Sequence, residues 1–459
     1  MINILVVCNS GHHSKNLIDL AESLADLDSR IRVVALCETQ DHQIYAKKIN
    51  PVKTRLVSPT SPGQNRDTKT IAVAKQIHQS IRFPKLLRFL METSVGYYLR
   101  EKKSKAYFLS RVPLIEKIFD EFRPVAVFSF GDRHVDIEVP AFIVAKARKV
   151  KIIIPYGTYA GAEGLVKMRQ VLGEPKRWTP FSLYRLYANF RLKGQTREGF
   201  FFQPPSIAFA MKSLGSLSSN PWCIGNGLSD VVCVDNDHTS LRYQKEGVPA
   251  KKIQIMGDLS YDSLYERYLR RSELRQEIIQ QYQFDPHQKI LLFALPQFAE
   301  QGILDWDQHW QEIRFLVSQV SQLEMNVLIS LHPRCNPDDY LFLEKEFAVR
   351  VAKQPLKELL PVADLFLAIN SSTVFWAVLC GIPAVVIDFY GLNVGLFSHL
   401  KTVRLVSNKK DLAPTLREAL SPHPQDLEED WAQLSRTKVF DGKVMERYYQ
   451  LLIRSEAHG

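Results

Sequence analysis

The chain has 459 residues, of which 46% are hydrophobic and 24% are charged, as in an ordinary soluble globular protein. This length predicts two domains with room for an insert. No run of about 18 uncharged apolar residues occurs, and no basic leader precedes the first apolar segment, so we expect neither a membrane-spanning helix nor a signal peptide. The six cysteines are scattered without a C-x-x-C pair, which favours a reducing cytoplasm over a zinc or disulfide framework.

Strand-like and helix-like patterns alternate through the first 160 residues. Apolar residues at helical spacing follow the first expected strand, and the same pattern follows the third. Such alternation predicts parallel pairing in a doubly wound sheet. The alternation of strands and helices stops at residues 162–225, which are basic, aromatic and rich in Pro, Gly and Ser. This composition predicts an insert of helices and loops. The strands expected in this half are 2–8, 31–36, 125–130, 150–154, 230–235 and 253–257.

A charged helix is expected over residues 265–282, and a second α/β unit follows it. Its expected strands are 289–295, 327–331, 363–369, 384–387 and 403–406. We therefore predict an α/β fold of two Rossmann-like domains with mostly parallel sheets. The first domain covers 1–265, including the basic aromatic insert, and the second covers 266–440. Residues 441–459 predict a helix that crosses back to the first domain.

Net charge is +10, and the excess is concentrated in two segments. Residues 166–198 and 81–111 each hold eight basic and two acidic residues, mixed with aromatic and other apolar side chains. This mixture suits an anionic membrane surface or a phosphorylated polymer. Nucleic acid would satisfy the same electrostatics, but no known nucleic-acid-binding motif occurs, and a solvated basic face is the plainer alternative.

Two polar motifs follow buried strands of the second half. His332-Pro333-Arg334 comes after residues 327–331, and Ser371-Ser372-Thr373 comes after residues 363–370. Ligands of open parallel sheets bind at the carboxyl ends of the strands, so an imidazole, a guanidinium and hydroxyls there can hold a phosphate. A free helix N-terminus at Thr373 would add to this site. The alternatives are a structural histidine and a simple helix cap.

Five further residues are candidates for binding or catalysis. Gln297 ends the first strand of the second domain and is placed to touch donor phosphates or base. Gly11 and His13 lie at the first strand-to-helix turn, where glycine admits a ligand and a histidine can act as a base.

Asp132 and Glu163 follow later strands of the first domain, and either carboxylate could deprotonate an acceptor hydroxyl. The catalytic base is therefore left open among Asp132, Glu163 and His13.

Three stretches together resemble the two-Rossmann-domain glycosyltransferases of the GT-B architecture. Gly247-Val248-Pro249-Ala250-Lys251-Lys252-Ile253 through Gly257-Asp258 looks like the stretch that precedes the second domain in such enzymes. Phe130-Gly131-Asp132 with Gly157-Thr158-Tyr159-Ala160-Gly161 is similar to the first domain of UDP-GlcNAc 2-epimerases. His332-Pro333 with Ser371-Ser372 looks like the paired motifs of bacterial sialyltransferases, polysialyltransferases, Kdo transferases and CDP-glycerol transferases.

The resemblance implies that His332, Ser371 and Ser372 contact a cytidine nucleotide and its phosphate. The epimerases carry acidic residues later in the second motif, whereas Thr373-Val374-Phe375-Trp376-Ala377 has none, which argues against an epimerase. Fold alone does not decide function.

The expected protein is a cytoplasmic glycosyltransferase, peripheral on the inner membrane face, that uses a nucleotide sugar and no cofactor. The leading donor is a CMP-activated sialic-acid-like or Kdo-like sugar, and a UDP-type donor stays open. The acceptor is a cell-surface glycan or a lipid-linked glycan. Asp-x-Asp matches at 235–237 and 305–307 are interpreted as chance, so catalysis is expected to be metal-independent. The alternatives are a nucleotide-sugar epimerase or hydrolase, a CDP-alditol phosphotransferase, or a non-catalytic protein that binds nucleic acid or membrane.

Overall fold

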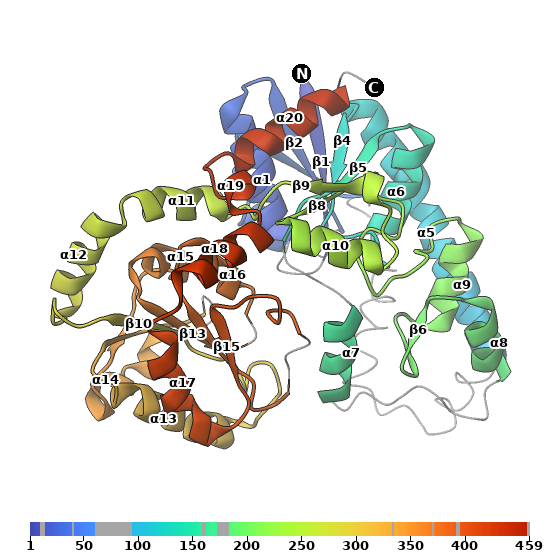
Figure 1. The fold of residues 1–459 in the computed structure, drawn as a ribbon. Helices are drawn as coiled ribbons and strands as arrows, with labels where there is room; N and C mark the ends of the chain where they lie inside the picture. The colour runs from blue at the N-terminus through green and yellow to red at the C-terminus, as the bar shows by residue number, and fades with distance from the viewer. Residues whose placement is uncertain are drawn as a thin grey trace.

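The structure, a computed structural model, describes residues 1–9, 14–38, 41–59, 94–157, 162–171, 183–332, 335–369, 371–391 and 395–456. Two parallel sheets with helices on their faces form two domains (Figure 1). This arrangement confirms the predicted α/β fold of two Rossmann-like domains. No helix in the described part of the chain is long and apolar enough to cross a bilayer.

The first sheet has seven strands in the order β3-β2-β1-β4-β5-β8-β9, all parallel. Their inner segments read as continuous apolar runs because helices cover both faces of the sheet. The strands are β1 (Ile2–Cys8), β2 (Ile31–Cys37), β3 (Thr54–Val57), β4 (Ala126–Phe128), β5 (Lys151–Ile154), β8 (Val231–Val234) and β9 (Ile253–Ile255). The helices beside them are α1 (Ser14–Leu27), α2 (His42–Ala46), α5 (Ser94–Phe122), α6 (Glu138–Ala147) and α10 (Asp237–Lys245).

The segment predicted as an insert forms small elements at one end of the first domain (Figure 1). A short antiparallel pair, β6 with β7, lies among three helices, and α9 packs along α5. The elements are α7 (Ala162–Val171), α8 (Leu183–Arg191), β6 (Thr196–Arg197), β7 (Phe200–Phe201) and α9 (Pro205–Ser213).

The second sheet has six parallel strands in the order β12-β11-β10-β13-β14-β15. The strands are β10 (Ile290–Ala294), β11 (Asn326–Ser330), β12 (Arg350–Val351), β13 (Leu365–Ile369), β14 (Ala384–Ile387) and β15 (Val403–Val406). The helices are α13 (Trp306–Ser321), α14 (Phe342–Glu346), α15 (Leu356–Leu359), α16 (Thr373–Leu379), α17 (Leu412–Ala419) and α18 (Pro424–Gln433).

Two helical features differ from the sequence-based expectation. The charged stretch before the second domain forms two helices, α11 (Tyr261–Leu269) and α12 (Arg271–Tyr282), because the backbone leaves helical geometry at Arg270. The 29-residue helix α5 was not predicted: it contains Pro113 and lacks a single apolar stripe, since α6, α8 and α9 contact it from different directions.

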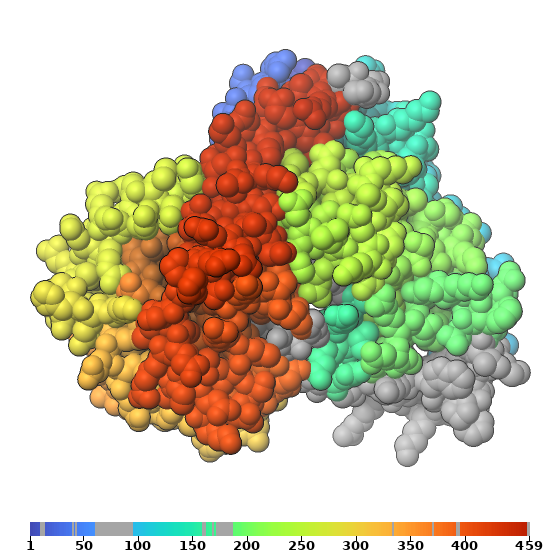
Figure 2. All heavy atoms as spheres, viewed as in Figure 1, coloured from blue at the N-terminus to red at the C-terminus, as the bar shows by residue number. Residues whose placement is uncertain are grey.

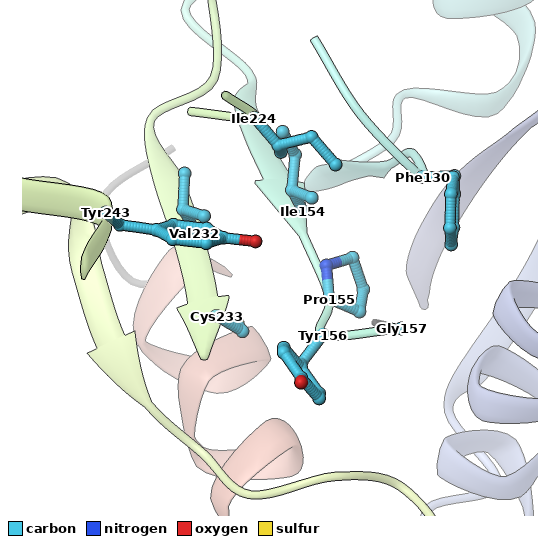
Figure 3. Close-up of a pocket in the computed structure, with 9 residues that line it drawn as sticks. All are labelled: Phe130, Ile154, Pro155, Tyr156, Gly157, Ile224, Val232, Cys233 and Tyr243. Carbon is cyan, nitrogen blue, oxygen red and sulfur yellow. The ribbon is translucent and has the colours of Figure 1, made fainter. Parts of the chain in front are cut away.

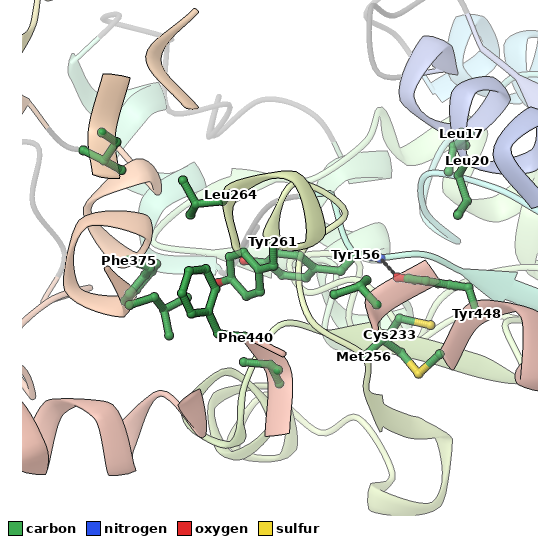
Figure 4. Close-up of a cluster of buried hydrophobic side chains, with 14 of the residues drawn as sticks. Leu17, Leu20, Tyr156, Cys233, Met256, Tyr261, Leu264, Phe375, Phe440 and Tyr448 are labelled. Atoms are coloured by element: carbon green, nitrogen blue, oxygen red, sulfur yellow. Dashed lines mark hydrogen bonds between the residues drawn. The ribbon is translucent and has the colours of Figure 1, made fainter. Parts of the chain in front are cut away.

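The chain returns to the first domain through α19 (Arg436–Val439) and α20 (Val444–Glu456), and the red C-terminal segments in Figure 2 run from the second domain over the first. The Asp262 carboxylate accepts hydrogen bonds from the Val444 and Met445 amides, both at 2.8 Å, at the positive end of α20. The Tyr448 hydroxyl accepts a hydrogen bond of 3.0 Å from the Tyr156 amide (Figure 4). One buried hydrophobic cluster therefore extends from the first sheet through α20 to the second domain.

Candidate active site

Three of the predicted binding residues follow three adjacent strands of the second sheet. His332 lies just beyond β11, Gln297 beyond β10 and Ser371 beyond β13, and the sheet order places β10 between the other two. Because all three strands are parallel, their carboxyl ends meet at one edge of the sheet. The structure thus brings His332, Gln297 and the Ser371–Thr373 segment to the edge where parallel sheets bind ligands.

The hydroxyls after β13 are partly exposed and form a local hydrogen-bonded turn. The Ser371 and Thr373 hydroxyl oxygens lie 2.8 Å apart and share a hydrogen bond, and the Thr373 amide donates to the Ser371 hydroxyl at 3.3 Å. The Ser372 side chain caps no amide at the start of α16 among the described residues. Its hydroxyl is therefore not used as the cap of α16.

The loops after β10 and β11 are joined to each other. The amide of the buried Gln297 side chain donates to the Cys335 sulfur at 3.6 Å, and the Cys335 backbone amide donates to the His332 carbonyl at 2.9 Å. These contacts join the backbone at the exposed His332 to the loop after β10. Pro333 and Arg334, like Gly11 and His13 in the first domain, lie outside the described residues.

The Asp132 carboxylate is buried and accepts four hydrogen bonds in the first domain. They come from the amides of Gly225 (2.9 Å), Gly227 (2.8 Å) and Ser229 (3.4 Å), and from the Ser229 hydroxyl (2.6 Å). A Cβ on Gly227 would approach the Asp132 backbone oxygen to 2.3 Å, so this loop packs tightly around the carboxylate. This geometry is typical of a carboxylate that stabilises a loop, here residues 225–229.

Glu163, in the first turn of α7, has the opposite environment. Its side chain is 63% exposed, and its carboxylate lies 3.5 Å from the guanidinium of Arg242 on α10. Arg242 also donates to the carbonyl of Gly395 in the second domain at 3.4 Å. On the same helix as Glu163, the Lys167 ammonium lies 3.8 Å from the position that a Cβ on Gly391 would take. Gly391 and Gly395 follow β14, the neighbour of β13, so α7 faces the sheet edge that carries Ser371.

A small pocket lies on the first-domain side, at the ends of β5 and β8 (Figure 3). Its empty volume is about 230 Å³, which includes space open to solvent. Most of its lining is apolar or aromatic, and the Tyr243 ring of α10 extends across it. The lining residues are Phe130, Ile154, Pro155, Tyr156, Gly157, Ile224, Val232, Cys233 and Tyr243.

Both Asp-x-Asp matches have structural explanations. The Asp305 carboxylate accepts the Gln308 amide at 2.8 Å and caps α13. Asp235 is buried, which raises the pKa of its carboxyl, and Asp237 pairs with Lys438.

Arg242, like Lys167, is a residue near this site that the sequence did not indicate. It lies in the last turn of α10 and not directly after a strand, and 79 positions separate it from Glu163. Its role follows from packing alone.

No protein-family model and no curated protein sequence matches the chain. Solved structures do share its architecture over nearly the whole length. UDP-GlcNAc 2-epimerase from Neisseria meningitidis, solved bound to UDP-GlcNAc, has a TM-score of 0.53 at 12% identity, over 99% of this chain and 100% of that chain. The glycotransferase of kitacinnamycin has a TM-score of 0.53 at 14% identity, over 99% and 98%. A putative UDP-N-acetylglucosamine 2-epimerase from Listeria monocytogenes has a TM-score of 0.50 at 11% identity, over 100% and 97%.

Identities this low establish a common fold and nothing finer. The chain therefore has the GT-B fold, in which two Rossmann-like domains face each other.

Proposed function

We propose that this protein is a glycosyltransferase that moves a sugar from a nucleotide donor to a glycan or lipid-linked acceptor. The observation that carries the proposal is the edge of the second sheet, where His332, Gln297 and the Ser371–Thr373 hydroxyls gather. These hydrogen-bond donors suit a nucleotide phosphate. Across from them, Glu163 projects from the first domain beside residues that contact the second.

In the proposed reaction, Glu163 takes the proton of an acceptor hydroxyl, and the oxygen attacks the anomeric carbon of the donor. A glycosidic bond forms while the bond from that carbon to the nucleotide phosphate breaks. The Ser371 hydroxyl group and the His332 imidazole would stabilise the negative charge that develops on the departing phosphate. The proposal assigns this stabilisation to side chains and uses no metal. Asp132, held by four hydrogen bonds, would maintain the first-domain loop.

The proposed donor is a CMP-activated, sialic-acid-like or Kdo-like sugar. The support is the likeness of His332-Pro333 and Ser371-Ser372 to the cytidine-binding motifs of transferases with this fold. A nucleotide-sugar epimerase is the second candidate, since two of the structures with the same fold carry that name. The lack of an acid in Thr373–Ala377 favours transfer.

A thermal-shift panel of CMP, CDP, UDP, GDP and ADP, run with and without EDTA, tests the nucleotide site. We expect CMP or CDP to raise the melting temperature and the others to leave it unchanged. A ligand present at 100 times its Kd stabilises the native state by about 2.7 kcal/mol. Stabilisation by UDP alone would replace the cytidine donor with a uridine one, and no stabilisation by any nucleotide would contradict the proposal.

The acceptor side of the proposal includes a membrane-docking surface on α5 and α8. On α8, Tyr187 and Phe190 are 52% and 76% exposed beside Arg191, and on α5 Tyr98 and Leu99 are exposed among basic residues. The two helices contact each other. Exposed aromatic side chains among cations are suited to an anionic lipid surface, where the rings enter the interface and the charges meet the headgroups.

Vesicle sedimentation tests this surface. We expect binding to phosphatidylglycerol vesicles that weakens as salt rises, and little binding to phosphatidylcholine vesicles. Tyr187→Ser with Phe190→Ser should lower the affinity at least about 10-fold, because each buried ring contributes about 1.5–3 kcal/mol. Leu269→Ser, which alters an equally exposed apolar residue on α11, is the control. Salt-independent binding, or equal binding by both variants, would refute the docking surface.

A further inference from the structure

Two imidazoles from different domains stack face to face. His238 lies in the first turn of α10 in the first domain, and His399 lies between β14 and β15 in the second. Their ring centroids are 3.4 Å apart and their planes differ by 6°. Both side chains are half-buried, and the Phe375 ring of α16 lies 6.3 Å from His399. The pair is thus a direct contact between the domains.

The surroundings of the pair favour neutral rings. The Nε2 atom of His238 and both ring nitrogens of His399 find no hydrogen-bond partner among the described residues. Burial, with Arg242 and Lys245, lowers the pKa of His238 to about 4. Burial, with His238 and Arg242, lowers the pKa of His399 to about 3.

The acidic groups nearby are engaged with other partners. The Asp237 carboxylate, next in the chain to His238, accepts hydrogen bonds from Ser435 and Lys438. The Glu163 carboxylate faces Arg242. The α10 charges that lower the pKa values of the pair are those of Arg242, which acts on both rings, and Lys245, which acts on His238, and they oppose protonation.

The stacked pair is linked to the proposed site through α10. Arg242 follows His238 by four residues, so the two side chains lie on one face of the helix. Arg242 reaches both the Glu163 carboxylate and the Gly395 carbonyl, four residues before His399. A contact that keeps α10 against the 395–399 segment therefore also keeps Glu163 near the second domain.

We propose that His238 and His399 are positioning residues that hold the two domains closed while both imidazoles are neutral, and that release the domains when protonated. The effect on catalysis rests on the proposed function, because closure would place Glu163 against the donor site. The closure itself does not depend on that function and can be measured without any substrate.

The direction of the pH effect follows from proton linkage. A histidine in an opened protein has an ordinary pKa near 6.5, above its value in the closed form, so the open form binds more protons as pH falls. Closure is therefore fully favoured above about pH 6.5 and is lost progressively below it. Between pH 7.5 and 5.5 each imidazole shifts the equilibrium about 10-fold towards the open form, and the pair shifts it about 100-fold.

Small-angle X-ray scattering of the full chain at pH 7.5 and 5.5 tests the closure. The radius of gyration should increase at pH 5.5 in the wild type. His238→Phe with His399→Phe keeps two stacked rings that cannot take a proton, so this variant should stay compact at both pH values. His399→Lys carries a permanent charge and should open at pH 7.5. His287→Phe, at an exposed histidine of the linker before β10, should behave as the wild type.

Circular dichroism at both pH values separates opening from unfolding, because opening leaves the helical signal unchanged. A titration of imidazole carbon resonances gives an independent measure. In it, the signals lost in the two single His→Phe variants should change from those of neutral rings to those of protonated rings over the same pH range in which the radius of gyration increases. A radius of gyration that does not change with pH in the wild type, or that changes equally in the double Phe variant, would overturn the proposal. Nucleotide binding that fails while the pH-dependent opening persists would count against the proposed function alone.

Discussion

Replacing both His332 and Ser371 by alanine should lower kcat/KM for sugar transfer by about 10²–10³-fold, the usual loss when a preorganised donor to a developing anion is removed. Both residues lie at the edge formed by β11, β10 and β13, and Ser371 also organises the Thr373 hydroxyl. The double variant should also lose the stabilisation by cytidine nucleotide. Steady-state kinetics with a CMP-sugar and the thermal-shift assay measure the two effects.

Matched substitutions outside the site distinguish this effect from general damage. Ser110→Ala removes an exposed helix hydroxyl on α5 that bonds the Tyr107 carbonyl, and His287→Ala removes an exposed imidazole. Both should retain wild-type activity and nucleotide binding. If the double variant at His332 and Ser371 binds nucleotide and turns over as the wild type does, the donor site lies elsewhere.

Glu163→Gln should lower kcat by about 10²–10⁴-fold, the typical contribution of a positioned general base, while nucleotide binding is retained. The amide keeps the size of the side chain but cannot accept the acceptor's proton. Single-turnover rates with saturating donor measure the chemical step. Glu121→Gln alters a comparably exposed glutamate that pairs with Arg55 on the first domain and should have no effect.

Asp132→Asn should instead lower stability more than it lowers kcat. Its carboxylate accepts bonds from four donors around the 225–229 loop, so loss of the charge should lower the melting temperature with a smaller change in kcat per folded molecule. A large fall in kcat for Asp132→Asn, with wild-type rates for Glu163→Gln, would transfer the role of base to Asp132.

The strands were largely predictable because their signal is local. Buried parallel strands such as β1, β11 and β13 are short apolar runs, and the polar residues that follow them mark the ends of the strands. Helix α5 was missed because its packing on several neighbours removes the one-sided pattern and Pro113 suggests a break. The break at Arg270 was missed because the charged stretch around it reads as one continuous helix.

The candidate site was predictable in one domain and not in the other. In the second domain the sheet order makes neighbours of the β10, β11 and β13 ends, so motifs at strand ends in the sequence become neighbours in space. In the first domain the sequence did not distinguish the candidates for the catalytic base. A carboxylate that follows a strand can cap a helix, hold a loop or act as a base. The structure shows different surroundings for the two carboxylates: Asp132 is held by hydrogen bonds and Glu163 is exposed, while His13 lies outside the described residues.

The sequence by itself determined the α/β fold of two Rossmann-like domains and the polar groups at the ends of the second sheet's strands, because periodicity and strand ends are local properties of the chain. The tertiary structure alone decided which first-domain residues face that edge. Arg242 bridges Glu163 and Gly395, and His238 stacks on His399, through packing between domains. Such contacts depend on how two folded surfaces meet, and no short stretch of sequence encodes them.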